Sequence, residues 1–311
     1  MMFRYPFVAM GSGCEVLVEA DSAAQVKPMI QSALTQIARL EAKYSRFRHD
    51  SLVARINREA HMRTVPLDEE TQTLLGLADR LYRDTGGRFD ITVGSLQACW
   101  DFRAMRLPDA EALARGLSAV GWAGVQWSTA GIRLPRPNMQ LDLGGLVKEY
   151  ALDVAVSVLA TLGVGRGLVN LGGDVRVVGS PPPSGRAFQV GVAHPRRHHG
   201  LCATLSLSAG ALVTSGDYQR YFIRDGVRYH HLLDPATGYP LPLRHAGLTT
   251  HGATAMAALH RGKAMLLTDS AEPPGDGAYL ACDGEGEPSA WRDAPGCEVR
   301  IHHAAPARQV G

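Results

Sequence analysis

Four glycine-rich segments place backbone amides beside polar side chains, an arrangement that can bind an anion. In residues 141–153, Gly144 and Gly145 precede a predicted helix, and Lys148 lies in its first turn. Backbone N–H groups at a helix start can approach a phosphate closely. A lysine there opposes the helix dipole, and a bound phosphate would explain its presence. A glycine turn followed by a solvated lysine has the same spacing, so both interpretations stay open at this point.

The other three segments are residues 169–174, 214–238 and 86–94. The first of these ends a predicted strand in an asparagine, two glycines and an aspartate, and a tight turn would have the same composition. The next contains His230 and His231 ahead of a Pro/Gly turn. A histidine near a carboxylate can act as a general base, although a capped turn would look alike. Residues 86–94 are also compatible with a strand followed by an aromatic residue of the core, Trp100.

Hydrophobic periodicity predicts the elements that position these segments. Helices are predicted over residues 22–44, 69–83 and 146–162, where apolar residues recur every three or four positions. Alternation and turn residues predict strands at 12–20, 167–171, 175–178, 187–193, 202–207, 211–214 and 228–233, with 115–142 read as strands joined by turns. Helices and strands occur in blocks, without regular alternation, which predicts an α+β fold.

We expect one main domain over residues 1–270, made of two closely packed lobes, followed by a divergent segment at 271–311. The tail after Asp269 is rich in Gly, Pro, Asp and Glu, a composition that packs poorly. Residues 180–185, with three consecutive prolines, are expected to form an exposed connection.

Composition excludes several classes of protein. The chain has 311 residues, 45% apolar and 20% charged, with a formal charge of +2, so a fibrous or wholly disordered chain is excluded. No run of lysines and arginines suggests nucleic-acid binding, and no apolar stretch approaches the roughly 20 residues of a membrane span. The five cysteines form no C-x-x-C pair. Without a signal peptide or a convincing lipobox, we expect a cytoplasmic protein.

In order and spacing, these segments resemble the ApbE family of FAD:protein FMN transferases. The matching residues are 9–12, 45–51, 85–94, 141–148, 169–174, 215–218 and 230–238. The resemblance implies an ApbE-like flavin transferase fold, in which mixed sheets with flanking helices leave an FAD cleft between two lobes.

The resemblance also implies an activity. Family members bind FAD together with a divalent ion, usually Mg²⁺, and move FMN onto a Ser or Thr hydroxyl of a target protein in a redox system, releasing AMP. In such a transfer, positioning and charge neutralisation do most of the catalysis. Two alternatives remain: a non-catalytic flavin-binding protein in redox-enzyme maturation, or an FAD pyrophosphatase that gives FMN and AMP.

Site residues are carried over from the matching motifs. Lys148 is expected beside the FAD phosphates, His231 as the base for the target hydroxyl, and the backbone carbonyl of Ala151 as a metal ligand. The remaining residues expected at the cofactor are Met10, Phe47, Arg88, Phe89, Asp90, Val154 and Leu233. Glu149 stands where the family commonly has a glycine.

One helix departs from the family pattern. The family carries a metal-binding Asp, and often a Thr four residues later, where this chain has Leu259 and Lys263 in residues 254–266. An aliphatic side chain cannot ligate Mg²⁺, which requires oxygen ligands. Lys263 would then neutralise the pyrophosphate itself, or His260 would ligate a softer ion. The departure predicts weakened use of Mg²⁺, or lost transfer with FAD binding kept.

Overall fold

An eight-stranded antiparallel sheet forms the centre of the molecule in this computed structural model, which describes residues 1–179, 186–268 and 270–302. Its strands, in spatial order, are β1 (Met2–Ala9), β2 (Ser12–Glu19), β5 (Gly167–Leu171), β6 (Asp174–Val178), β9 (Ala211–Gly216), β12 (Gly247–Gly252), β13 (Tyr279–Cys282) and β14 (Pro288–Arg292). Strand β2 shows the underlying pattern, since Cys14, Val16 and Val18 are buried while the residues between them are less so. Such alternation places one face of a sheet on a core.

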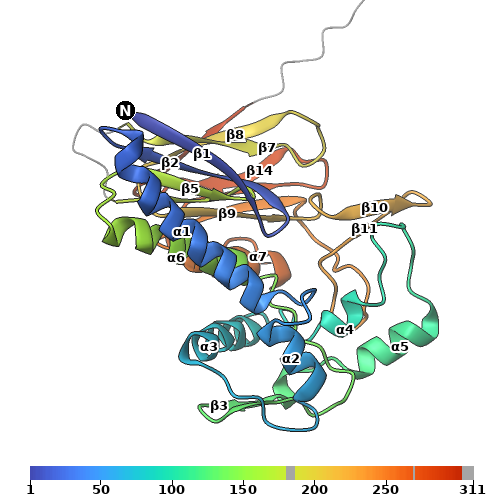
Figure 1. Cartoon of the computed structure of the whole chain (residues 1–311). Coiled ribbons are helices and arrows are strands. Elements are labelled where there is room, and N and C mark those ends of the chain that lie inside the picture. Colours follow the sequence, from blue (N-terminus) through green and yellow to red (C-terminus); the bar gives the residue numbers. More distant parts are fainter. Residues whose placement is uncertain (180–185, 269, 303–311) are drawn as a thin grey trace, which may run out of the picture.

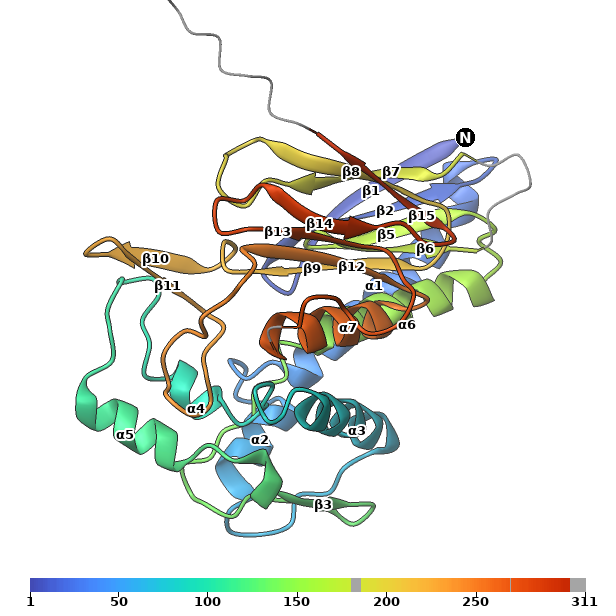
Figure 2. The same cartoon turned by 180° about the vertical axis from the view of Figure 1, so that it is seen from behind.

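A second, three-stranded sheet covers one face of the first (Figure 2). It consists of β15 (Cys297–Ile301), β8 (Leu201–Leu207) and β7 (Phe188–Ala193). Leu205 and Leu207 of β8 share a buried apolar cluster with Leu168 and Val175 of the large sheet. The two sheets therefore pack face to face through their apolar sides.

Three helices cover the opposite face of the large sheet (Figure 1): α1 (Ala23–Tyr44), α6 (Val147–Thr161) and α7 (Ala255–Thr268). Helix α1 begins at the N-cap Ser22, whose side chain accepts a hydrogen bond from the backbone N–H of Gln25. Its apolar stripe, which includes Ile30 and Ile37, joins the same core as Leu159 of α6. This helical layer brings the start of α6 and the length of α7 close together.

A smaller, mostly helical lobe lies beyond that layer. It contains α2 (Leu52–Glu59), α3 (Glu69–Asp84), α4 (Gly94–Gln97), α5 (Ala110–Ser118), a 3-10 turn at Trp122–Gly124, and the short strands β3 (Gln126–Ser128) and β4 (Gly131–Arg133). The hairpin of β10 (Tyr221–Arg224) and β11 (Val227–His230) extends over this lobe (Figure 2). The turn after β11 is fixed to it, because the Trp100 indole N–H donates to the carbonyl of Gly238 at 2.9 Å.

The predicted α+β class is confirmed, and so are the helices predicted at 22–44, 69–83 and 146–162. Two expectations are wrong. Residues 115–142 contain the end of α5 and a 3-10 turn as well as two three-residue strands. The tail does pack, since β13 and β14 extend the large sheet and β15 joins the small one. The connection at 180–185 and residues 303–311 lie outside the described part of the chain.

No helix in the described residues is both long and apolar enough to cross a membrane.

Candidate active site

The glycine pair before α6 is held by side chains of the helical lobe. The carboxylate of Asp142 accepts the N–H of Gly144 at 2.8 Å and pairs with the guanidinium of Arg46 at 3.1 Å. A Cβ on Gly145 would lie 3.4 Å from the ring of Phe89. Two of the segments singled out in the sequence, 86–94 and 141–148, therefore meet at this turn, and Lys148 follows in the first turn of α6.

Lys148 forms an ion pair with Asp174, the first residue of β6. Asp174 is buried, and its other carboxylate oxygen accepts the backbone N–H of Thr214 in β9 at 2.9 Å. Gly172 lies beside this pair: its φ is +60°, which favours glycine, and a Cβ there would lie 2.8 Å from that of Ser12. The ion pair and the hydrogen bond of Asp174 thus join three of the predicted segments.

A second lysine, Lys263 of α7, is buried in the same cluster. Desolvation lowers the pKa of Lys263, while the negative charges of Glu149 and Asp174 oppose that shift. Burial and the neighbouring Asp174 raise the pKa of Glu149, and one of its carboxylate oxygens has no hydrogen-bond partner in the described structure. Lys148, Lys263, Glu149 and Asp174, hereafter the lysine cluster, lie close enough for their charges to act on one another, and the raised pKa of Glu149 favours its uncharged form.

The residues of this cluster do not fit a magnesium cage. Leu259 is 1% exposed and belongs to the main apolar core. Within residues 1–179, 186–268 and 270–302, no group of three or more His, Cys, Asp or Glu side chains could hold a metal ion. The His260 imidazole lies 2.7 Å from a carboxylate oxygen of Asp84, so this ring is engaged elsewhere.

The two neighbouring histidines differ in their hydrogen bonds: both ring nitrogens of His230 are engaged, whereas one ring nitrogen of His231 is available. Nε2 of His230 lies 3.1 Å from the carbonyl of Leu241, and its Nδ1 accepts the N–H of Leu232 at 3.3 Å. Nδ1 of His231 lies 3.2 Å from the carbonyl of Arg220. A carbonyl only accepts, so Nδ1 of His231 carries the proton and Nε2 has a lone pair. Burial, and then the charge of Lys263, lower the pKa of His231 to about 4, which keeps the ring neutral.

Three other residues expected at the cofactor lie around this region. Met10 occupies the β1–β2 turn with φ +50°, and its backbone N–H donates to the Glu41 carboxylate at 2.9 Å. Phe47, just after α1, is 81% exposed. Arg88 donates to the carbonyl of Leu267 at 2.7 Å, which fixes it to the end of α7. Their contacts with FAD stay predictions.

The remaining expected residues have clear internal roles. Asp90 accepts the backbone N–H of Thr92 at 2.7 Å and that of Trp122 at 3.0 Å, so both its oxygens hold the local turn. Ala151 is fully buried in α6, and Leu233 lies in the apolar cluster around Trp100. Val154 lines a groove between α1 and α6 whose lining includes neither lysine of the cluster. The cofactor roles of Asp90, Val154 and Leu233 and the metal role of Ala151 stay predictions.

Sequence reasoning missed the residue that positions α7. Asp153, one turn after Glu149, accepts the backbone N–H groups of Ala255 at 2.7 Å and Met256 at 3.0 Å. It also pairs with Arg176 at 2.6 Å. A carboxylate at a helix N-terminus satisfies otherwise unpaired donors. Its spacing from Lys148 was visible in the sequence, but its partner lies about a hundred residues away along the chain.

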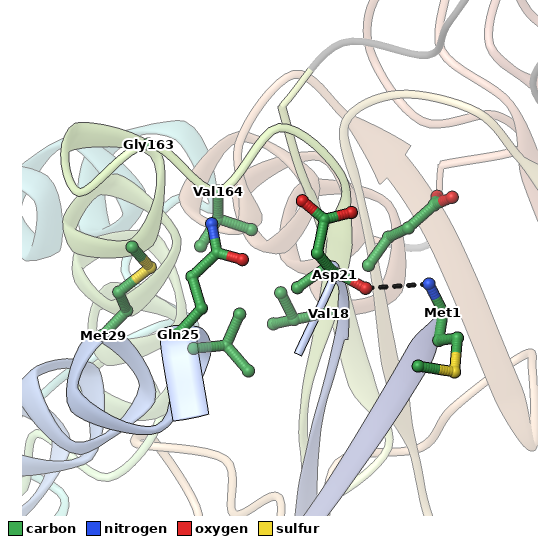
Figure 3. Close-up of a pocket in the computed structure, with 10 residues that line it drawn as sticks. Met1, Val18, Asp21, Gln25, Met29, Gly163 and Val164 are labelled. Carbon is green, nitrogen blue, oxygen red and sulfur yellow. Dashed lines mark hydrogen bonds between the residues drawn. The ribbon is translucent and has the colours of Figure 1, made fainter. Parts of the chain in front are cut away.

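A separate pocket lies far from these residues (Figure 3). It is lined by the end of β2, the start of α1 and the turn at Gly163 and Val164. That turn follows the C-terminal end of α6, whereas Lys148 lies at its N-terminal end, about 20 Å away at 1.5 Å per residue. We assign this pocket no part in the chemistry of the lysine cluster.

Comparisons with known proteins identify the family of this chain. The family model described as "ApbE family" matches residues 10–271. A protein from Treponema pallidum named FAD:protein FMN transferase is 31% identical over 254 residues, covering 75% of this chain and 69% of that protein. A Klebsiella pneumoniae protein of the same name is 30% identical, covering 77% and 74%.

Solved structures show the same fold. The ApbE protein of Thermotoga maritima superposes with a TM-score of 0.82 at 29% identity, over 93% of this chain and 96% of that one. The flavin transferase ApbE of Vibrio cholerae gives 0.79 at 21% identity, over 94% and 97%, a likeness of fold alone. With a family model that spans most of its length and relatives this similar, the chain belongs to the ApbE family.

Proposed function

We propose that this protein transfers FMN from FAD to a Ser or Thr hydroxyl of an acceptor protein and releases AMP. Membership of the family supports this proposal, as do the names of the Treponema and Klebsiella relatives. The observation that carries it is the state of His231. Its Nδ1 proton is held by the carbonyl of Arg220, so Nε2 is free to accept a proton.

In this proposal the two lysines bind and neutralise the pyrophosphate of FAD. Lys148 of α6 lies close enough to Lys263 of α7 to lower the pKa of Lys263, and ammonium groups bind phosphate oxygens as point charges. His231 takes the hydroxyl proton of the acceptor on Nε2. The acceptor oxygen then bonds to the FMN-side phosphorus, the bond from that phosphorus to the bridging oxygen breaks, and AMP leaves with the bridging oxygen.

We further propose that this chain depends only weakly on Mg²⁺. The metal position expected near residue 259 is a buried leucine, and the charge four residues later is a lysine. An ammonium one helical turn away occupies the place where a cation would be needed, and like charges repel. Lys263 therefore takes over part of the charge neutralisation that a metal supplies in the family.

Intact-mass analysis tests the proposed transfer. The protein is incubated with FAD and a candidate acceptor of a redox system, and the acceptor should gain the mass of one FMN unit while AMP appears in solution. His231→Asn should abolish the gain and leave FAD binding intact. His260→Asn is the matched control, because His260 on α7 is paired with Asp84. AMP and FMN without a labelled acceptor would indicate a pyrophosphatase, and FAD bound but not consumed would indicate a non-catalytic flavin protein.

A further inference from the structure

A basic pocket lies beside the β10–β11 hairpin, outside the lysine cluster. It is formed by the β7–β8 turn (193–201) together with Tyr218, Tyr221 and Arg228, and its volume is about 480 Å³. Its lining includes three arginines and three histidines, and none of the lining residues is acidic. The chemistry of this pocket favours an anionic ligand.

The positive charges of the pocket are partly compensated, because Arg196 pairs with Asp217 and Arg197 pairs with Glu287. Arg196 binds Asp217 through two hydrogen bonds of 2.6 and 2.7 Å, so this carboxylate is already engaged. Arg228 lies 4.0 Å from the same carboxylate and stacks on the ring of Tyr221 at 3.8 Å. One of its terminal nitrogens is buried without a hydrogen-bond partner in the described part of the chain. A buried donor of this kind is costly unless a ligand satisfies it.

His194 also lines the pocket, and its second ring nitrogen lies near a carboxylate of this chain. Its side chain is 2% exposed, and its Nδ1 accepts the backbone N–H groups of Arg196 and Arg197, both at 3.1 Å. Nδ1 therefore carries no proton, and Nε2 is a donor. That nitrogen is buried, lies 3.5 Å from a carboxylate oxygen of Glu287 and makes no hydrogen bond within the described residues.

An apolar rim adjoins the basic pocket. Leu201 and Tyr221 line the pocket and are 51% and 38% exposed, and Ile223 and Val227 are exposed elsewhere on the β10–β11 hairpin. Strands β10 and β11 form a sheet of two strands, so each is paired along one edge. Aromatic and apolar groups beside arginines are typical of protein interfaces.

The hairpin connects this pocket directly to the proposed base. Arg228 lies on β11, three residues before His231. His230, between them, is buried; desolvation lowers its pKa, Asp217 raises it, and Arg228 and Arg196 lower it further. Three residues of extended chain span about 10 Å, so a bound segment of a few residues could reach from Arg228 toward His231.

We propose that this pocket docks the acceptor protein through an acidic segment that neighbours the target hydroxyl. The inference rests on the proposed transfer, and it adds how the acceptor is recognised. The charge of the pocket selects carboxylates, the apolar rim and the volume suit a peptide rather than a single small anion, and continuity with His231 suits a chain that also presents a hydroxyl.

Fluorescence anisotropy with two synthetic peptides tests the proposal without FAD. One labelled peptide carries a single Thr flanked by Asp residues, and the other has Asn in place of every Asp. The Asp peptide should bind more tightly, and added salt should weaken it. Arg228→Gln and Arg197→Gln should each weaken binding about tenfold, the effect of losing one charge-assisted contact. The side chain of Arg197 is 48% exposed and pairs with that of Glu287, which is 44% exposed, so Arg197→Gln breaks an ion pair at the surface rather than a buried one.

Arg224→Gln is the matched control, since Arg224 lies on the same hairpin, is exposed and does not line the pocket. It should bind the Asp peptide like the unchanged protein, and FAD affinity measured by calorimetry should be equal in all three variants. Equal binding of both peptides, or an equal loss in Arg224→Gln, would overturn the proposal. So would displacement of the peptide by inorganic phosphate at a similar concentration, which would mark a site for free phosphate. Because no FAD is present, these results stand apart from any failure of transfer.

Discussion

Lys263 lies close enough to His231 for its positive charge to lower the pKa of the imidazole, in addition to the larger effect of burial. The two residues come from α7 and from the turn after β11, and no sequence motif links them. The pairing keeps the proposed base neutral and places a positive charge near the position where the pyrophosphate is proposed to bind. Lys263, which stands where the family often has a threonine, thus affects the proton affinity of His231, the proposed base.

The pH dependence of transfer follows from this relationship. A histidine with its pKa lowered from about 6.5 to about 4 stays unprotonated throughout the mildly acidic range. Transfer should therefore persist below pH 6.5 and fall only as the pH approaches about 4. Lys263→Met should move the acid limb upward, because one of the causes of the low pKa is removed. The rate of AMP release as a function of pH measures the acid limb of the wild type and of the variant. An acid limb that does not move in Lys263→Met would contradict the effect of Lys263 on the pKa of His231.

Stability should respond to pH in the same sense. The unfolded chain takes up a proton on this histidine near pH 6.5, whereas the folded chain does so only near 4. The unfolded state therefore binds more protons in that window, and the free energy of unfolding falls as the pH is lowered through it. The contribution is fully present above pH 6.5. Urea titrations of wild type and His231→Asn at several pH values isolate it, since the variant should lose part of the slope.

Lys148→Ala should weaken FAD binding more than riboflavin binding, because only FAD has the phosphates that this lysine is proposed to contact. A charge-assisted contact contributes about 1.5–3 kcal/mol, a ten- to hundredfold change in affinity. Calorimetry with both ligands measures the difference. Lys27→Ala, at an exposed position of α1, is the control. Equal losses for the two ligands would show that Lys148 serves the fold through Asp174 alone.

The affinity for FAD should depend weakly on Mg²⁺ in the unchanged protein. Leu259→Asp should increase that dependence, because it restores an oxygen ligand at the expected position. Leu259→Asp combined with Lys263→Thr should increase it further, since the competing ammonium is gone. FAD titrations with Mg²⁺ and with EDTA give the comparison. A strong EDTA effect on the wild type would mean that other residues hold the metal.

Asp153→Ala should destabilise the fold and displace α7. The carboxylate satisfies two backbone donors at the start of α7 and pairs with Arg176. Leaving such donors unsatisfied costs about 1–3 kcal/mol. The free energy of unfolding in urea measures this loss, and Asp21→Ala, at an exposed position after β2, should leave it unchanged. If α7 positions Lys263, FAD affinity should fall in Asp153→Ala as well.

The local elements of the site could be predicted from the sequence, because their signals are local. Glycines next to Lys148 and the apolar stripe of 146–162 were sufficient to place α6, and the confirmed family resemblance identified the segments that meet at Asp174. The neighbours of those elements could not be predicted in this way. Glu149 and Lys263 are separated by more than a hundred residues, and only packing of α6 against α7 brings their charges together.

The prediction for the tail after Asp269 was wrong because it relied on residue composition, which does not show which strands pair with one another. Strands β13 and β14 are short, and their flanks contain many turn residues, so the tail looked unable to pack. Hydrogen bonding to a neighbouring strand compensates for weak intrinsic preference. The prediction of strands over residues 115–142 was wrong for the opposite reason. The apolar residues of this segment fill the helical lobe without forming long strands.

The position of β13 sets a limit on how short a working chain can be. The family match ends at residue 271, but β13 pairs with β12 and β14 pairs with β13 beyond that point. A chain ended at 271 would expose the backbone groups of β12 along a whole edge, beside the apolar surface that β15 and β8 share. Unprotected edges of this kind join other molecules. Shortened forms made to match the family boundary are therefore expected to self-associate, and biochemical work should retain the chain through at least residue 301.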